Sequence, residues 1–469
     1  MKFRLSAINF SAFRPDGSLE PFRLLRSDIR NILKRYASDW TVFNQLILAS
    51  AVFVFCTNLL PGITFASDLD VATGKQWGTI EVVFKIFSLL NSVIYVHKAI
   101  QVLQRAYDST SFASFLYSII STTGTLFLAV LLSTAEIWRP IFHRYVRMGL
   151  REYAAAISII TLVGISHAGR LETLDQQFLA VSKSFRPSSP DRSVFFVQFW
   201  HLPVTWVFAA LIPGLIITVL FFFDHEVSSI ICTDKRYGTS KPSGFAWDIV
   251  LLGTTTAMCG ILGIPPANGL LPQAPLHSES LMHKVQVTGP VIGNPNAVEK
   301  AESGHEGEDE GEETTTIERV YEQRWSHFLH AGGILAFISP PLMHVLGLTP
   351  TSVLAGLFLF MGEQSLSVNP LLYRILDLLT PPSELPLLPE TIWSYWSIHL
   401  YTVAQVAITA GIFAITLTAA APAFPIIIVA LVPLRLFIIN RLWSRETLRF
   451  IDRWACRDGT PEDDATTND

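Results

Sequence analysis

The sequence has little charge for its length. Asp, Glu, Lys and Arg make up 16% of its 469 residues, whereas they make up about 25% of an ordinary soluble domain. The hydrophobic residue types AVILMFWYC supply 50% of the chain, and the mean hydropathy is +0.39. A soluble protein of this length needs more charge to cover its surface. The composition therefore excludes a disordered chain and a typical cytosolic enzyme, and it indicates an integral membrane protein.

Cysteine is also scarce, with four residues in the whole chain. Cys56, Cys232, Cys259 and Cys456 are far apart and form no C-x-x-C pair, which excludes a disulfide framework and a cysteine-based metal site. The net charge of −5 argues against a nucleic-acid partner, because nucleic acids select basic surfaces. We expect no secretory signal peptide, because the first 39 residues contain eight Lys and Arg residues.

Several catalytic motifs are absent from the sequence. It contains no H-E-x-x-H, no G-x-S-x-G and no G-x-x-x-x-G-K-[ST]. Intramembrane proteolysis, acyl transfer and ATP-driven transport therefore lack a motif. His327 and His330 share a helix face at i and i+3, but no acidic or Cys residue joins them there. We predict that the protein is not an enzyme and uses neither a metal nor a cofactor.

Long uncharged segments predict where the chain crosses the bilayer. A spanning helix needs about 20 apolar residues, because about 30 Å of hydrocarbon is crossed at about 1.5 Å per residue. Six windows without Asp, Glu, Lys or Arg reach that length: 40–67, 109–135, 193–223, 249–278, 325–362 and 391–434. Two of these windows are long enough for two helices each, with breaks near 347–350 and 421–423. Weaker spans at 82–104 and 153–169 complete an all-α polytopic bundle with about eleven crossings.

The distribution of basic residues predicts the orientation, because Lys and Arg accumulate in short cytoplasmic loops. Basic residues lie in the N-terminal arm and in the segments 139–151, 235–241 and 435–457. Both termini are therefore expected in the cytoplasm. These orientations conflict for the first two spans. The basic N-terminal arm requires the first span to end outside the cytoplasm, whereas the basic segment 139–151, which follows the third span, requires the second span to begin in the cytoplasm. The acidic insertion 283–323 is expected to be a disordered loop.

Helix breakers interrupt one apolar window. Four prolines lie within the segment 263–277. Inside a membrane, such a segment persists only where protein or a cavity surrounds its unpaired backbone groups. A short helix beginning near Asn268 would point its amide dipoles into the membrane interior and form an anion site. Asn268 could cap this helix and Gln273 could bind a small polar solute, whereas the alternative is a proline-kinked helix packed on its neighbours.

One acidic residue follows a strongly apolar span. Asp224 comes directly after three phenylalanines, Phe221 to Phe223. An acid inside a membrane is costly and usually faces a cavity or a partner. Asp224 could accept a hydrogen bond from a protonated solute or carry a coupled proton. The alternative is a helix cap at the cytoplasmic edge of the membrane.

Four runs of the chain resemble one transporter family. They are NLLPGITFA at 58–66, YVHKAIQ at 95–101, FDHEVSS at 223–229 and the interrupted stretch 263–281. On these runs the sequence resembles the bicarbonate/borate anion-exchanger superfamily, and within it the fungal boron-efflux branch. The similarity extends over most of residues 40–445.

This resemblance implies a fold and a function. The fold would be a seven-plus-seven inverted repeat with core and gate domains, in which two half-helices bind substrate at mid-membrane. The function would be secondary transport of a small inorganic anion by alternating access, with borate efflux as the first interpretation and bicarbonate or anion exchange as the alternative. The implied setting is the lipid bilayer of the plasma membrane or the vacuole. A homodimer through the gate helices is one arrangement that the resemblance allows.

The resemblance also implies substrate-binding residues. Asp224 matches the family's functional acidic position, and Asn268 and Gly269 match the opening of the second half-helix. Gln273 lies where chloride-exchanging animal relatives carry Arg, and a neutral amide there favours a polyhydroxylated solute over chloride. Thr64 on the first helix is a weaker contributor.

The sequence departs from the family after its first span. The chain continues almost directly into a segment that resembles the family's fifth helix, so three helices of the first repeat, about 65 residues at about 20 per crossing, are missing. Three explanations for the missing helices are open. The sequence comes from a gene model or splice form without an exon, it is a transport-inactive paralogue that acts by association, or it is a rearranged bundle that still transports.

The resemblance and the charge pattern together divide the chain into five segments. We expect a basic N-terminal arm at 1–39, an incomplete first repeat at 40–169, a connecting segment at 170–202, a second repeat at 203–445 with a half-helix near 267–280, and a cytoplasmic tail at 446–469.

Overall fold

The structure is a computed structural model, and most of the chain that it describes is helical. It describes residues 22–72, 84–138, 141–181, 194–233, 237–264, 266, 273–288, 314–367, 370–385, 395–418, 440–443 and 447. The first half contains α1 (Arg23–Arg35), η2 (Tyr36–Trp40), α2 (Gln45–Ala72), α3 (Phe84–Ser109), α4 (Phe112–Ser133), η3 (Ala135–Ile137), α5 (Arg144–Glu152), α6 (Ala154–Ser166), η4 (Gly169–Thr173), η5 (Phe199–His201), α7 (Val204–Ala209) and α8 (Leu211–Cys232). The second half contains α9 (Phe245–Leu262), α10 (Gln273–Ser280), β1 (Met282–Thr288), β2 (Thr314–Val320), α11 (Trp325–Ala336), α12 (Pro340–Gly347), α13 (Thr351–Ser367), α14 (Pro370–Asp377), α15 (Tyr395–Thr416) and α17 (Asn440–Leu442). The mostly helical structure agrees with the expected all-α class.

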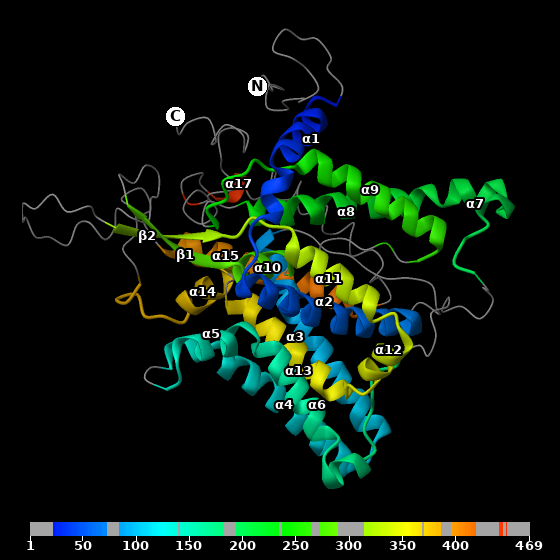
Figure 1. The fold of residues 1–469 in the computed structure, drawn as a ribbon, viewed down its shortest axis with the longest axis vertical. Helices are drawn as coiled ribbons and strands as arrows, with labels where there is room; N and C mark the ends of the chain where they lie inside the picture. Colours follow the sequence, from blue (N-terminus) through cyan, green and yellow to red (C-terminus); the bar gives the residue numbers. More distant parts are fainter. Residues whose placement is uncertain are drawn as a thin grey trace, which may run out of the picture.

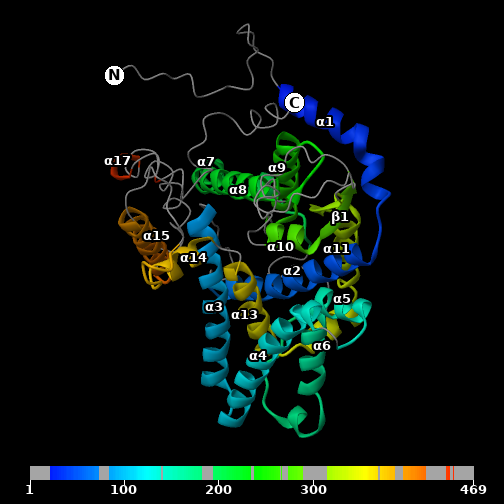
Figure 2. The same ribbon diagram turned by 90° about the vertical axis from the view of Figure 1, so that its left-hand side faces the viewer.

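The main core lies between α3, α4, α6 and α13. In the two views α3 runs along the long axis of the molecule, whereas α2 and α8 lie across it (Figures 1 and 2). Val353, Ala355 and Phe358 of α13 are fully buried in this core. Helices α13 and α4 approach closely at Gly356, and Thr122 Oγ1 donates a hydrogen bond to the Ser352 carbonyl oxygen over 2.9 Å. Small residues and hydroxyl groups therefore hold this helix pair together, as is common between helices in membranes.

The described residues include helices that can cross a membrane. By length and composition α4, α9 and α15 qualify, and up to seven spans result if each of four bent helix pairs is one span. These residues do not confirm the expected number of about eleven crossings, and the predicted break near 421–423 lies outside them. The window 325–362 contains three helices instead of the expected two, because Pro340 and Pro341 end α11 and begin α12 at an angle of 93°. The break expected near 347–350 is confirmed between Gly347 and Thr351.

The expected interruption after residue 262 is present. Helix α9 ends at Leu262, and Gly263 follows with φ of 59°, a left-handed conformation that glycine adopts without a steric penalty. Helix α10 begins at Gln273, whereas residues 267–272 lie outside the described part. A continuous proline-kinked helix is therefore wrong for this window.

A β-hairpin lies where the sequence predicts a disordered loop. Strands β1 and β2 pair antiparallel from Met282 opposite Val320 to Thr288 opposite Thr314. The ends of the segment 283–323 therefore differ from the expectation, because their Val, Ile and Thr residues favour strands. Residues 289–313, which contain the acidic run, lie outside the described residues.

Candidate functional site

The short helix α10 is held in place on three sides. Ser280 Oγ and Ser50 Oγ of α2 share a hydrogen bond of 2.6 Å, and His277 Nε2 and Ser326 Oγ of α11 share one of 2.9 Å. Tyr237 donates its hydroxyl proton to Glu279 Oε1 over 3.3 Å. These contacts all lie in the second half of α10, which leaves its first residue, Gln273, at the opposite end.

Gln273 has one satisfied and one unsatisfied polar atom. Its Nε2 donates a hydrogen bond of 2.7 Å to the hydroxyl oxygen of Tyr95 on α3. Tyr95 is buried and stacks on Phe358 of α13, with ring centroids 6.0 Å apart. The Oε1 atom of Gln273 is buried and has no hydrogen-bond partner among the described residues. A buried acceptor without a partner costs about 1–3 kcal/mol, so Oε1 is suited to accept a hydrogen bond from a ligand.

The first turn of α10 adds a second kind of interaction. The first amide groups of a helix have no partner within it, and the helix dipole places partial positive charge there. The first turn of α10 contains no acidic residue that would cancel this charge. Together, the helix terminus and Gln273 Oε1 could bind a small solute that carries both negative charge and hydroxyl donors.

The structure brings together the three helices that carry predicted site residues. Helix α10, with Gln273, packs against α2, which contains Thr64, and against α8, which contains Asp224. Asp224 lies within α8, which continues to Cys232, so it does not cap the end of this helix. The side chains of Thr64 and Asp224 are not among those described, and Asn268 and Gly269 lie outside the described residues.

Tyr95 is the contact of Gln273 that the sequence did not single out. It belongs to the run 95–101 used for the resemblance, but no motif marks its hydroxyl as part of a site. A tyrosine in an apolar span needs a partner for its hydroxyl group, and this is the one signal that could have identified it. The described residues contain no group of three or more His, Cys, Asp and Glu side chains that could hold a metal ion.

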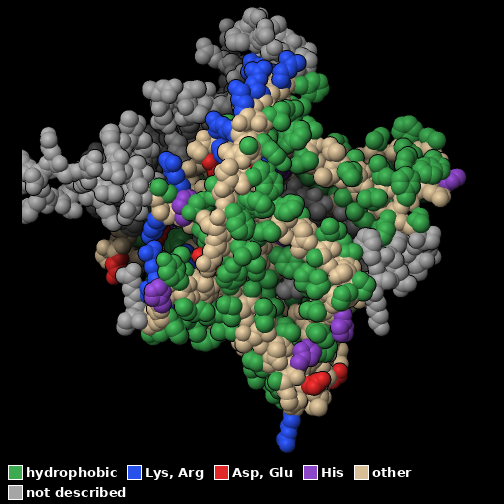
Figure 3. All heavy atoms as spheres, viewed as in Figure 1, with side chains coloured by type: hydrophobic (Ala, Val, Ile, Leu, Met, Phe, Trp, Pro, Cys, Tyr) green, Lys and Arg blue, Asp and Glu red, His purple; other side chains and the backbone are tan. Residues whose placement is uncertain are grey.

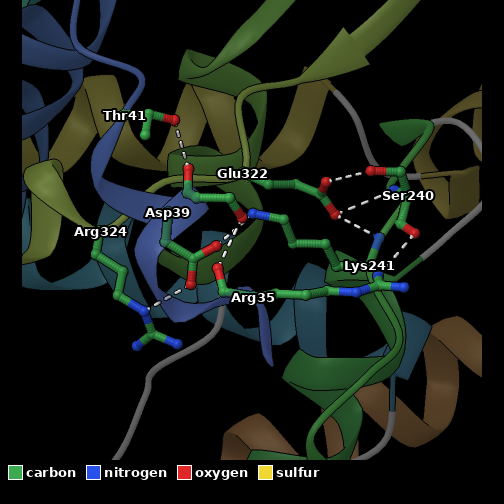
Figure 4. Close-up of polar contacts among 8 residues, drawn as sticks. Arg35, Asp39, Thr41, Ser240, Lys241, Glu322 and Arg324 are labelled. Atoms are coloured by element: carbon green, nitrogen blue, oxygen red, sulfur yellow. Dashed lines mark hydrogen bonds and ion pairs between the residues drawn. The ribbon is translucent and has the colours of Figure 1, made fainter. Parts of the chain in front are cut away.

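A second polar cluster connects the N-terminal arm to two later segments (Figure 4). Asp39 at the end of η2 accepts hydrogen bonds from Lys241 Nζ and, over 2.8 Å, from Arg324 Nε. Glu322 Oε1 accepts hydrogen bonds from the backbone amides of Ser240 and Lys241 over 3.0 and 2.9 Å. We call Asp39, Lys241, Glu322 and Arg324 the Asp39 clamp. It lines a cavity of about 580 Å³ beside the aromatic rings of residues 36, 40 and 328.

The clamp changes the acidity of Asp39. Burial alone raises the pKa of this carboxyl group, but the hydrogen bonds and positive charges of Lys241 and Arg324 outweigh it. The pKa therefore lies below its ordinary value of 3.8. Because the folded state holds Asp39 ionised, the clamp stabilises the fold fully above about pH 4, and this stabilisation is lost as the pH falls through the folded pKa.

Asp39→Asn is expected to destabilise the protein and to reduce its sensitivity to acid. At neutral pH the loss of a charged hydrogen-bond acceptor should cost about 2 kcal/mol. As the pH falls through the lowered pKa of Asp39 in the folded state, the melting temperatures of the parent and the variant should converge. The measurement is the melting temperature of the full chain in detergent from about pH 3 to pH 7. Glu318→Gln, which removes an exposed partner of Lys284, is the control and should change little. Parallel curves for the parent and Asp39→Asn would contradict the role of the clamp.

Comparison with known proteins places these features among membrane transporters. Residues 88–455 match the family model described as the HCO3− transporter integral membrane domain. A putative transporter of Schizosaccharomyces pombe is 35% identical over 87% of this chain and 74% of its own length. Boron transporter 1 of Saccharomyces cerevisiae is 27% identical over 91% of this chain and 84% of its own length. Anion exchange protein 3 of Homo sapiens is 28% identical over 72% of this chain and 26% of its own length.

The alignment with Boron transporter 1 also reveals a length difference. It extends over 522 positions, whereas this chain has 469 residues. The difference means that at least 53 positions of the alignment have no residue of this chain.

Proposed function

The chain belongs to the HCO3− transporter family of integral membrane domains, and from this premise we propose that it is a secondary transporter that exports borate. Anion transport is the activity of this family of membrane transporters. Boron transporters of yeast and of Arabidopsis thaliana are among its relatives, and they support borate as the substrate. The plasma membrane is the proposed location, with both termini in the cytoplasm.

The observation that carries the proposal is the buried, unpartnered Oε1 atom of Gln273 at the start of α10. Borate carries several hydroxyl groups and one negative charge. A hydroxyl group of borate would donate a hydrogen bond to Gln273 Oε1, and the amide groups of the half-helix would stabilise the charge. Asp224 on α8 would accept a further hydrogen bond or a coupled proton, and Asn268, Gly269 and Thr64 would complete the site.

The proposed mechanism is alternating access within a seven-plus-seven inverted repeat. Core helices that carry the site would move as a body against gate helices, and this motion requires no covalent chemistry. We propose that the first repeat is incomplete, and the 53 or more unmatched positions in the alignment with Boron transporter 1 support a loss of chain relative to that protein. Sequencing of the transcript would show whether about 65 residues after Leu69 are absent, at about 20 residues per crossing.

Bicarbonate or anion exchange is the second candidate function. The similarity to Anion exchange protein 3 supports it. Bicarbonate has one hydroxyl donor, so it would make less use of a side-chain acceptor at residue 273. Proteoliposomes loaded with borate or with bicarbonate separate the two candidates, because the proposal requires faster borate efflux. A transport-inactive chain that acts by association would move neither anion.

The proposal is tested in a yeast strain that lacks its borate exporter. The parent chain should restore growth at high borate, and Asp224→Ala should abolish this rescue because the site loses its acidic acceptor. Asp108→Ala, which removes an exposed acid near the end of α3, is the matched control and should rescue fully. Failure of the parent chain to rescue while it is present at the plasma membrane would overturn the function. Full rescue by Asp224→Ala would overturn the site.

A further inference from the structure

Helix α1 carries a continuous stripe of positive charge. Arg23, Arg26, Arg30 and Lys34 follow one another at intervals of three or four residues, so they lie on one face of the helix. All of them are exposed, and none forms an ion pair with a residue that the structure describes. Figure 3 shows Lys and Arg side chains in a line along this helix at one end of the molecule. We call these residues the α1 stripe.

The opposite face of α1 is fixed to the rest of the protein. Asp28 Oδ2 accepts hydrogen bonds from the backbone amides of Ala246 over 2.9 Å and of Trp247 over 3.3 Å, and it thereby caps the N-terminus of α9. Ile32 lies against Gly244, directly before α9. Because α1 turns by about 100° per residue, these contacts hold the stripe away from α9. The stripe is therefore a rigid surface that the fold presents outward.

Three observations support a position of the α1 stripe beside a bilayer. The segment Arg23–Trp40 makes an angle of 109° with Gln45–Asn58, the first part of the apolar helix α2. Because of this bend, α1 does not continue the direction of α2, and the two segments do not form one straight spanning helix. At the corner, Trp40 packs edge-to-face on Trp325, with ring centroids 5.0 Å apart, and Trp is enriched at membrane interfaces. Phe22 and Leu33, which are 77% and 71% exposed, flank the stripe.

We propose that the α1 stripe binds the anionic phospholipid headgroups of the adjoining leaflet. Clusters of Lys and Arg directly before a spanning helix attract such lipids, and the exposed apolar side chains beside the stripe favour a bilayer over a soluble polyanion. This surface is separate from the substrate site at α10. Helix α1 is linked to two other parts of the protein, because Asp28 caps α9 and because α1 continues into η2, which carries Asp39. Lipid binding to α1 would therefore also hold the N-terminus of α9 and the Asp39 clamp in place.

The test compares the full chain in nanodiscs of phosphatidylcholine alone with nanodiscs that also contain phosphatidylserine. Amide hydrogen exchange across α1 should be about tenfold slower with phosphatidylserine, since each basic residue near an anionic surface adds to the attraction. The variant Arg26→Gln/Arg30→Gln should lose this difference, and high salt should remove it in the parent. The matched control is Lys284→Gln/Arg319→Gln, which removes the same charge from the exposed hairpin and should retain the difference.

Each result bears on the proposal. Slower exchange that depends on both phosphatidylserine and the α1 stripe supports it, provided that exchange in the core helix α4 shows both variants to be folded. Equal exchange of the parent in the two kinds of nanodisc overturns it. Inositol hexakisphosphate added to phosphatidylcholine nanodiscs is the competing ligand. If it slows exchange in α1 as strongly as phosphatidylserine does, the stripe binds a soluble polyanion and the assignment to lipid is wrong.

Discussion

Gln273→Leu is expected to reduce borate efflux by about 10- to 100-fold. Leucine has a volume similar to that of glutamine but has no polar atom, so the variant loses both the acceptor Oε1 and the donor to Tyr95. Two lost hydrogen bonds at about 0.7–1.4 kcal/mol each correspond to this range, since 1.4 kcal/mol is a tenfold change. The measurement is the initial rate of borate efflux from proteoliposomes. Tyr95→Phe should have a smaller effect, because it removes the partner of Gln273 and leaves Oε1 in place.

Gln405→Leu is the matched control for this experiment. Gln405 on α15 is also a buried glutamine whose Oε1 has no partner among the described residues. Its replacement removes the same chemical groups from another helix, so it should leave the initial rate of borate efflux unchanged. Equal transport by the parent and by Gln273→Leu would remove Gln273 from the site. An equal loss in both variants would show that the defect comes from the loss of a buried amide in general.

Gly356→Ala is expected to destabilise the protein by about 1–3 kcal/mol, the usual cost of overpacking a core. A Cβ atom at residue 356 would lie 2.5 Å from Thr125 Cβ and 2.6 Å from the backbone carbonyl oxygen of Thr122. Both neighbours belong to α4, and neither is the end of a flexible side chain. Helices α13 and α4 would therefore have to separate, and the hydrogen bond from Thr122 to Ser352 would be strained or lost. The measurement is the melting temperature of the full chain in detergent.

Gly164→Ala in α6 controls for the effect of alanine itself. The structure shows no atom within 4 Å of a Cβ at residue 164. Since alanine favours a helix over glycine by about 0.5–1 kcal/mol, this variant should keep or raise the melting temperature. If the two variants melt at the same temperature as the parent, the close approach of α13 and α4 does not contribute to stability.

Much of the helical structure could be predicted from uncharged windows and helix breakers. The window 109–135 became α4, and the predicted spans 82–104 and 153–169 lie within or around α3 and α6. The break after Leu262 followed from local chemistry, because proline cannot continue a helix and glycine can end one. The errors have local causes too. Pro340 and Pro341 divided a window that was read as two helices, and the hairpin at 282–320 was hidden by the acidic run between its strands.

The sequence by itself determined that the chain is a helical membrane protein, where one apolar window is interrupted, and which family the chain resembles. These conclusions depend on composition and on residues close together in the chain. Only the tertiary structure decided that Tyr95 meets Gln273, that Asp39 meets Lys241 and Arg324, and that Asp28 caps α9. Each of these contacts joins segments at least 178 residues apart. Such pairs depend on how helices pack, and a single sequence has no local pattern that records which helix becomes the neighbour of another.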